Sequence, residues 1–142
     1  MNKTIKINDW IKIPKNFTGV AEHLISGINY WFKEGNLHRD NGPAIEYING
    51  NKEWWVEGLR HRIDGPAVEY SNREKYWYVE DICYSIYKLQ SLIQTSIYLG
   101  KKQNGNHNLD WLRFLTDKGI KEFPIVPGME KSYLPFLLAS LD

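Results

Sequence analysis

Two histidines and two aspartates recur along the chain in a pattern that suggests metal binding. His38 precedes His61 by 23 residues, and Asp40 and Asp64 lie close behind them. Imidazole nitrogens and carboxylate oxygens are common ligands of Zn²⁺, and such an ion would support a metal-dependent hydrolase. Adjacent hairpin units of a sheet lie about 10 Å apart, however, which is too far for the two imidazoles to share one ion easily. We therefore expect each histidine to pack against a tryptophan and bond the turn backbone, with no metal and no cofactor.

An arginine follows each of these histidines. Arg39 and Arg62 could contact a ligand, but a guanidinium group beside aromatic residues more often stacks on a ring or pairs with a carboxylate. The carboxylates nearest in the repeat are Glu46, Glu69, Asp40 and Asp64.

Aromatic residues recur at the same spacing and form three ladders. These are Trp31, Trp54 and Trp77; Phe32, Trp55 and Tyr78; and Tyr47 and Tyr70. Neighbouring residues in a strand point to opposite faces, so one tryptophan-type ladder can be core while the next is exposed. An exposed aromatic ladder suits protein binding and could also stack single-stranded bases. The residues predicted to bind a partner are Phe32, Trp55, Tyr78, Tyr47, Tyr70, Arg39 and Arg62.

Other sequence features favour a chain that is not an enzyme. Cys83 is the single cysteine, which rules out an intrachain disulfide and predicts a cytoplasmic protein. No protease pattern surrounds it, and no phosphate loop, dinucleotide fingerprint or paired zinc motif is present. The net charge of +1 makes nucleic-acid binding unlikely. No segment is apolar enough for a membrane span or a signal peptide, so no membrane contact is expected.

These residues belong to a segment whose sequence is closely repeated. Residues 31–47 are followed by a close copy at 54–70 in a chain of 142 residues. Strands are expected over 29–33 and 51–56, each ending in a Glu-Gly turn, and return strands begin at 38–40 and 61–63. A third half-unit starts at Trp77, and the repeat ends where Asp81, Tyr84 and Ser85 replace its glycine, histidine and arginine. A fixed period of this size predicts stacked units.

The flanking segments differ from the repeat. Residues 3–7 alternate as a strand does, and residues 16–30 are either a worn terminal repeat or contain a short helix over 21–25. After the repeat the spacing of Ile86, Leu89, Ile93 and Ile97 predicts a helix over 86–99 that Gly100 ends. Further helices are expected over 108–119 and 133–141, with a loop over 122–128.

The pattern Trp-x-x-x-Gly-x-x-His-Arg-x-Asp-Gly-Pro-Ala resembles the MORN-repeat variant of bacterial and phage-encoded proteins, over residues 29–84. The resemblance implies an antiparallel sheet of successive hairpins, an interaction role and no catalytic residues. We therefore expect an α+β fold. Its parts are an N-terminal strand and degenerate capping repeat over 1–28, a β-repeat sheet over 29–84 and a helical C-terminal region over 85–142.

The expected function is a non-catalytic protein–protein interaction module. Because the resembling proteins occur in phage and mobile-element genomes, a small inhibitor that sterically covers a host defence protein is a special case. The alternatives are a metal-dependent hydrolase built on the His and Asp positions and a single-stranded nucleic-acid binder using the aromatic ladders. An uncovered sheet edge or face would also favour a homodimer.

Overall fold

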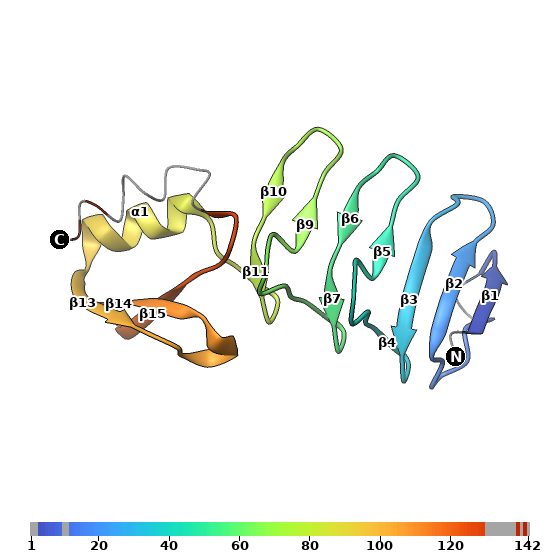
Figure 1. The fold of residues 1–142 in the computed structure, drawn as a ribbon, viewed down its shortest axis with the longest axis horizontal. Helices are drawn as coiled ribbons and strands as arrows, with labels where there is room; N and C mark the ends of the chain where they lie inside the picture. The colour runs from blue at the N-terminus through green and yellow to red at the C-terminus, as the bar shows by residue number, and fades with distance from the viewer. Residues whose placement is uncertain (1–2, 10–11, 130–138, 140, 142) are drawn as a thin grey trace. The chain divides into compact units, whose positions relative to one another are not determined.

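The computed structural model describes residues 3–9, 12–129, 139 and 141, and the chain divides into two compact units (Figure 1). The first comprises Met1–Arg62 and Ala67–Ile82, and the second comprises Ile63–Pro66 and Cys83–Asp142. Within the described residues the strands are mostly antiparallel and one α-helix accompanies them, which is an α+β fold. No helix in this part of the chain is long and apolar enough to cross a membrane.

The first unit is a row of hairpins that lie side by side (Figure 1). Its main sheet has the strand order β1-β2-β3-β5-β6-β9-β10, with β4 paired to β3, and the pairs β7-β8 and β11-β12 form separate short ladders. The strand predicted over 29–33 is confirmed as β3, and the one over 51–56 is divided at Trp54 into β6 and β7. The return strands begin at Asn36 and Leu59, directly after the turns, so their predicted starts at 38–40 and 61–63 are wrong. The bounds are β1 Lys3–Ile7, β2 Gly19–His23, β3 Asn29–Lys33, β4 Asn36–Leu37, β5 Ile45–Glu46, β6 Lys52–Glu53, β7 Trp55–Val56, β8 Leu59–Arg60, β9 Val68–Glu69, β10 Lys75–Tyr76, β11 Tyr78–Val79 and β12 Ile82–Cys83.

Two-residue turns with positive φ close one side of each hairpin, as the Glu-Gly pairs predict. Glu57 and Gly58 have φ of 51° and 79°, and Glu34 and Gly35 have nearly the same values. A two-residue hairpin turn with positive φ at both positions matches the right-handed twist of its strands, and glycine adopts this conformation without steric cost. Asp81 takes the glycine position of the third turn with φ of 65°.

The opposite hairpin tips also contain a left-handed residue. Gly50 has φ of 93° and Arg73, at the same place in the next unit, has φ of 75°. The preceding asparagine fixes each tip, because Asn49 and Asn72 each accept a hydrogen bond from the backbone N–H two residues further on, both at 3.0 Å. The second tip therefore holds a side chain in a conformation that favours glycine.

Arg73→Gly is expected to stabilise the repeat unit. Left-handed backbone costs a non-glycine residue about 1–2 kcal/mol, and part of that gain is offset by the greater freedom of glycine when unfolded, which leaves about 0.5–1 kcal/mol. Denaturant unfolding, followed by tryptophan fluorescence, measures the change. Gly50→Arg is the matched control and should lower the midpoint. A lower midpoint for Arg73→Gly would contradict the role assigned to this tip.

An N-terminal cap closes one end of the sheet. Strand β1 confirms the strand expected over 3–7, and it pairs in parallel with β2. Ile7, Phe17 and Ala21 form a buried cluster between them. The helix considered over 21–25 is wrong, because β2 is held in extended form by strand pairing with both β1 and β3.

The hydrogen bonds of the cap match those of the repeat with one segment missing. Gly35 N–H donates to the Phe17 carbonyl as Gly58 N–H donates to that of Leu37. Residues 17–19 thus stand where 37–39 stand in the next unit. Ala21 pairs with Tyr30 as Ile45 pairs with Glu53, so the cap proceeds directly into its strand without a counterpart of residues 40–43.

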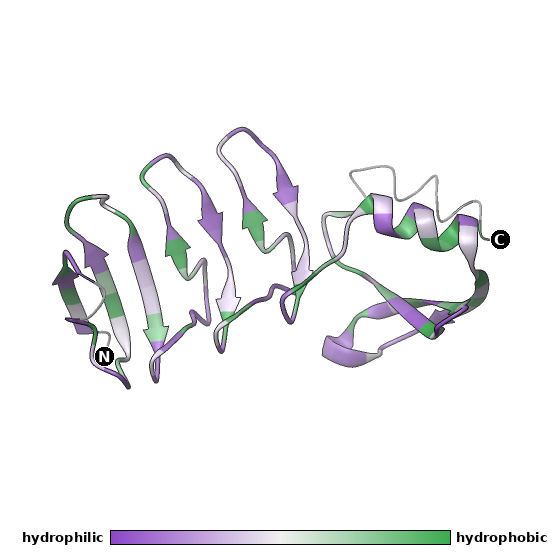
Figure 2. Ribbon diagram, turned by 180° about the vertical axis from the view of Figure 1, so that it is seen from behind, coloured by the Kyte–Doolittle hydropathy of each residue, from purple (hydrophilic) through white to green (hydrophobic). Residues whose placement is uncertain are grey.

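The second unit packs one helix on a three-stranded sheet, α1 lying over β13, β14 and β15 (Figure 2). The bounds are α1 Ile86–Thr95, β13 Ile97–Lys102, β14 Asp110–Thr116 and β15 Gly119–Ile125, with a 3-10 turn at Asn106–Asn108. The Ser85 side chain caps α1 by accepting a hydrogen bond from Lys88 N–H at 3.2 Å. Fully buried Leu89, Leu112, Phe114 and Phe123 form the core.

The predicted helical C-terminal region is therefore correct only in its first part. The first helix ends at Thr95, and Gly100 lies in β13 rather than at a C-cap. The helix over 108–119 is wrong, because this segment is β14 and the turn into β15, and the loop over 122–128 is wrong as far as Ile125. The helix expected over 133–141 falls on residues 133–138 and 140, outside the described part of the chain.

Candidate interaction surfaces of the repeat sheet

Both ring nitrogens of His38 are engaged in the structure. Nδ1 accepts a hydrogen bond from Glu57 N–H at 3.0 Å, so the proton of the neutral ring is on Nε2, which donates to Asp40 Oδ1 at 2.7 Å. The side chain is only 9 % exposed. The hydrogen bond from His38, aided by the positive charge of Lys33, lowers the pKa of the Asp40 carboxyl. The imidazole thus supports the turn of the next hairpin, and neither ring nitrogen is left for a metal.

His61 repeats the arrangement one unit further along. Its Nδ1 accepts a hydrogen bond from Glu80 N–H at 3.0 Å. The predicted bond to turn backbone is confirmed for both histidines, although each histidine supports the turn of the following unit. In the first turn a threonine takes the place of the histidine: Thr18 Oγ1 accepts a hydrogen bond from Glu34 N–H at 2.9 Å. Among the described residues, no group of three or more His, Cys, Asp or Glu side chains could hold a metal ion.

The repeated arginines lie between a tryptophan ring and a glutamate. The guanidinium of Arg39 lies 4.0 Å from the ring centre of Trp31 and 2.9 Å from a carboxylate oxygen of Glu46. Gly42 passes so close that an added Cβ would lie 3.1 Å from this guanidinium, which favours glycine at this position. The prediction that these arginines stack and pair is confirmed.

Arg62 occupies the equivalent place in the next unit. It lies 3.9 Å from the ring centre of Trp54 and 3.4 Å from Glu69. A cation over an aromatic face contributes about 0.5–1 kcal/mol at exposed sites and more when desolvated. The two arginine groups therefore stabilise the fold and also set the charge pattern of one face of the sheet.

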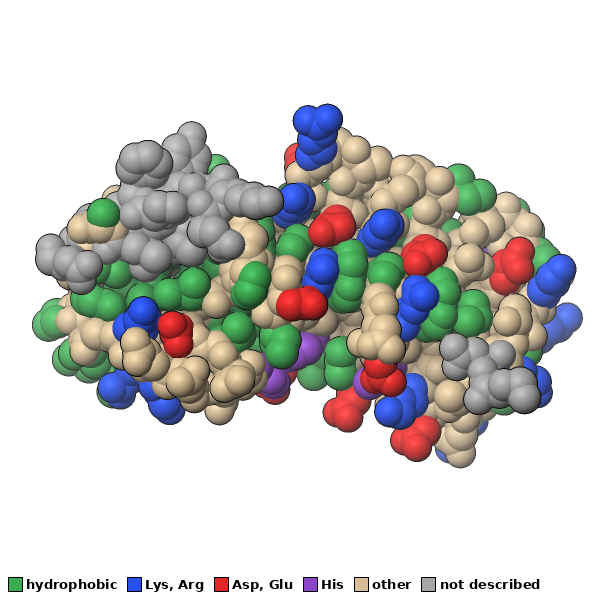
Figure 3. Space-filling model, viewed as in Figure 1, with side chains coloured by type: hydrophobic (Ala, Val, Ile, Leu, Met, Phe, Trp, Pro, Cys, Tyr) green, Lys and Arg blue, Asp and Glu red, His purple; other side chains and the backbone are tan. Residues whose placement is uncertain are grey.

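That face carries a row of alternating charges. Register pairs Glu46 with Lys52, Lys52 with Glu69, and Glu69 with Lys75. Directly opposed residues share a face of the sheet, so each lysine lies between or beside glutamates. Acidic and basic side chains alternate across the repeat strands in Figure 3. The row is close to neutral overall and so differs from the basic surface that a phosphate backbone requires.

The neighbouring row of the sheet places tyrosines around a single glutamate. Register runs from Tyr30 through Ile45, Glu53 and Val68 to Tyr76. The Tyr47 hydroxyl donates a hydrogen bond to Glu53, and the ring centres of Tyr70 and Tyr76 are 5.7 Å apart. Burial, followed by the nearby Glu53, raises the pKa of both Tyr30 and Tyr47. We call Tyr30, Tyr47, Tyr70 and Tyr76 with Glu53 the tyrosine surface.

The ladder of Phe32, Trp55 and Tyr78 is half-buried rather than freely exposed. Arg60 lies 4.4 Å from the ring centre of Tyr78 and 5.6 Å from that of Trp55, and it pairs with Asp81 at 3.0 Å. The Trp55 indole N–H is buried and has no acceptor among the described residues. Arg60 was missed from the sequence because Leu37 occupies its position in the preceding unit.

Exposed aliphatic side chains gather at the hairpin tips. Ile25 is 82 % exposed and Ile48 is 79 % exposed, and Leu24 and Tyr70 extend the same edge. Figure 2 shows hydrophobic residues at the tips of the first two hairpins of the repeat sheet. We call Leu24, Ile25, Ile48 and Tyr70 the hairpin-tip ridge. Sequence reasoning missed Leu24, Ile25 and Ile48 because turn residues contribute nothing to strand periodicity.

Neighbouring tips hold one another in place. An added Cβ on Gly27 would lie 2.4 Å from Ile48 Cδ1, so Ile48 packs directly on the preceding tip. Ser71 N–H donates to Asn51 Oδ1 at 2.8 Å, which joins the second tip to the third. The turns that form the ridge therefore support one another through direct contacts.

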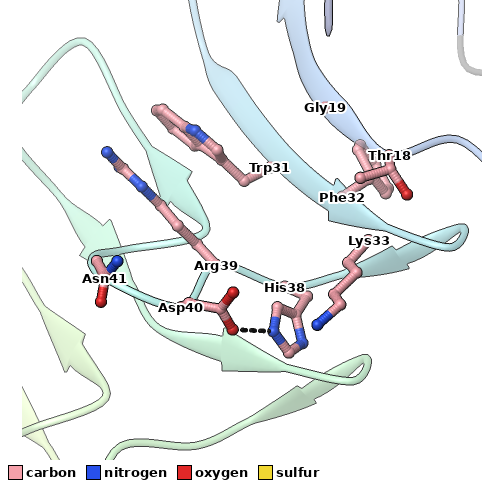
Figure 4. A pocket seen from close by; sticks show the side chains of 9 residues that line it. All are labelled: Thr18, Gly19, Trp31, Phe32, Lys33, His38, Arg39, Asp40 and Asn41. Carbon is pink, nitrogen blue, oxygen red and sulfur yellow. Dashed lines mark hydrogen bonds and ion pairs between the residues drawn. The ribbon is translucent and has the colours of Figure 1, made fainter. Parts of the chain in front are cut away.

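A groove of about 480 Å³ lies beside the first histidine (Figure 4). The Arg39 side chain extends along Trp31 on one side, and His38 and Lys33 lie on the other. Within the lining His38 donates to Asp40, whereas Arg39 pairs with Glu46 outside it. The lining residues are Thr18, Gly19, Trp31, Phe32, Lys33, His38, Arg39, Asp40 and Asn41.

The predicted partner-binding residues thus fall into three separate groups. Arg39 and Arg62 belong to the charged face, and Tyr47 and Tyr70 belong to the tyrosine surface. In the ladder of Phe32, Trp55 and Tyr78, Arg60 packs on the last two rings and Phe32 packs against Phe17. Comparison of the chain with protein-family models, curated proteins and solved structures gives no match.

Proposed function

We propose that the chain is a non-catalytic protein-binding module that contacts its partner through the hairpin-tip ridge and the tyrosine surface. The observation that carries the proposal is the exposure of Ile25 and Ile48, at 82 % and 79 %, on tips that are locked together. Isolated exposed aliphatic residues are ordinary, but a contiguous set on a pre-formed surface marks an interaction site. Preformed turns also lose little conformational freedom on binding, which favours affinity.

The tyrosine surface supplies the second part of the proposed interface. Tyrosine rings bury apolar area while their hydroxyl groups still form hydrogen bonds, and they are enriched among the residues that dominate binding energy. Tyr70 and Tyr76 are both exposed and in contact, and Tyr70 also belongs to the hairpin-tip ridge. A partner with apolar side chains and hydrogen-bonding groups fits this combination.

The same geometry favours a protein over the two alternatives. A metal-dependent hydrolase would need ring nitrogens that His38 uses for Glu57 and Asp40. A single-stranded nucleic acid would need bases to reach Trp31 and Trp54, which arginines cover in company with glutamates. A specific form of the proposal is a small inhibitor that covers the active or nucleic-acid site of a defence protein, the role that the sequence resemblance implies.

Site-specific photocrosslinking in the native cell tests the proposal. A photoreactive amino acid placed at position 25 or 48 is expected to capture the same protein. Position 59 is the matched control, because Leu59 is an exposed aliphatic residue at the opposite turns of the hairpins. Nucleic-acid adducts, equal capture from all three positions or no protein adduct from 25 and 48 would overturn the proposal.

A binding measurement with the captured partner completes the test. Ile48→Glu places a charge in the centre of the ridge and is expected to weaken binding at least tenfold, about 1.4 kcal/mol. Leu59→Glu should leave binding unchanged. Both side chains reach solvent, with Ile48 79 % and Leu59 42 % exposed, so neither variant should prevent folding.

A further inference from the structure

The sheet of the second unit has an edge strand, β15, with no described strand on its outer side. The sheet order is β13-β14-β15, and within the described part of the chain β15 pairs with β14 alone. The residues of β15 from Gly119 to Glu122 are exposed. An edge strand presents unpaired backbone N–H and C=O groups that can pair with another strand.

The two edges of this sheet differ in their protection. Strand β13 has an irregular register between Tyr98 and Gly100, and it ends in Lys101 and Lys102. Bulges and lysines are devices that keep an edge from pairing. The register of β15 against β14 is continuous over all seven residues from Gly119 to Ile125. Pro124 lacks an N–H and limits pairing to the stretch before it, so Gly119–Phe123 of β15 is the part of the edge suited to pairing.

An exposed apolar row runs across the sheet to this edge. Ile97 is paired with Leu115, and Leu115 with Ile120. The three side chains are 64 %, 43 % and 51 % exposed. Directly opposed residues share a face. Because Phe114, next to Leu115, points into the core, the row lies on the face away from it.

We infer that β15 pairs antiparallel with β15 of a second copy of this chain, about a two-fold axis at Ile120. This register sets the two Ile120 side chains opposite each other, so the apolar row of one copy continues into the row of the other. It joins the two sheets into one and gives the same surface on both subunits, as a two-fold interface requires.

The charges next to the axis favour this register. Pairing about Ile120 opposes Gly119 to Lys121 of the second copy. It also brings Lys118, in the turn directly before β15, near Glu122 of that copy, and the symmetry repeats this attraction. An axis at Lys121 would oppose two lysines, and an axis at Glu122 would oppose two glutamates. Like charges directly opposite one another destabilise a strand pair, so the sequence selects the register centred on Ile120.

A charge exchange tests the register in solution. Sedimentation equilibrium of the full chain is expected to show a dimer of 16.7 kDa protomers. Lys118→Glu and Glu122→Lys each place like charges at the interface and should raise the dissociation constant at least tenfold, while the double variant should restore it. Lys3→Glu, on the edge strand of the other sheet, is the control and should have no effect. A monomer at all concentrations, or a dimer indifferent to these exchanges, overturns the inference.

A cysteine crosslink tests the position of the axis. Residues opposed in an antiparallel pair have Cα atoms about 4.5–5.5 Å apart, within the range of a disulfide. In a Cys83→Ser background, Ile120→Cys should therefore form a covalent dimer on mild oxidation. Lys121→Cys, one residue from the axis, should not. Equal crosslinking at both positions, or crosslinking at 121 alone, contradicts pairing about Ile120.

Discussion

Gly19→Ala is expected to detach β1 from the repeat sheet. Gly19 has φ of 146°, and a Cβ there would lie 2.0 Å from the Lys3 carbonyl oxygen of β1. The Cβ would be fixed to the backbone of β2 and the carbonyl oxygen belongs to the backbone of β1, so neither atom can move aside as the end of a side chain can. Overpacking of this kind costs about 1–3 kcal/mol, and the left-handed conformation adds about 1–3 kcal/mol, so a loss of about 3 kcal/mol or more is expected.

Hydrogen exchange locates this effect. The amides of β1 should lose protection in Gly19→Ala, while those of β9 and β10 at the other end of the sheet should keep theirs. Gly50→Ala is the matched control, since Gly50 also has positive φ but an added Cβ would meet its nearest neighbour at an ordinary 3.7 Å. If the two variants lost equal stability and β1 stayed protected, the close approach of β1 to β2 would be wrong.

His38→Ala is expected to be the second large effect, a loss of about 2–4 kcal/mol. The change leaves the Glu57 N–H without its acceptor and removes a side chain that is 9 % exposed. An unsatisfied donor costs about 1–3 kcal/mol, and loss of buried volume adds to it. Chemical unfolding measures the difference. His61→Ala removes the same bond from Glu80, but its less buried ring should make the effect smaller.

Acid should reduce the difference in stability between His38→Ala and the unchanged chain. The hydrogen bond from His38 lowers the pKa of the Asp40 carboxyl in the folded chain, so its contribution is present above the unfolded value of about 3.9 and disappears as pH falls through the folded value. The part of the loss that comes from buried volume should remain at low pH. A difference that did not change between neutral and acid pH would contradict the contribution assigned to the His38–Asp40 pair.

The repeat could be read from the sequence because its signals are local. The Glu-Gly turns at Gly35 and Gly58 and the histidine at each turn are determined by residues within one unit or the next. The cap was harder, since residues 17–19 match 37–39 but residues from 20 onward match those from 44 onward. A constant shift of 23 places Ala21 on Ala44, whereas the pairing places it on Ile45.

The periodicity of residues 108–119 predicted a helix instead of strand β14, and the reason is physical. Strand β14 buries Trp111, Leu112 and Phe114, so apolar residues occupy adjacent positions and the alternation of a half-exposed strand is lost. The same spacing fits one face of a helix. Aromatic enrichment favours a strand, and Pro124 is tolerated in β15 because this strand lies at the edge.

Contacts on the candidate surfaces were predictable only where both contacting residues recur with the 23-residue repeat. Stacking of Arg39 on Trp31 follows from residue types that recur with the repeat. The contact of Ile48 with Gly27 joins two turns that differ in sequence and in length, and strand register alone brings them together. No pattern within one unit contains that information.

The histidine bonds give the row of hairpins a polarity. Each imidazole acts on the turn after its own, so Thr18 begins the series and Tyr84, which stands where a further histidine would, ends it. The series of turns therefore has a direction along the chain, with one residue type at its start and another at its end. Inserting a 23-residue copy of residues 39–61 directly after His61 would add one repeat unit. The number of hairpins can therefore be changed by design.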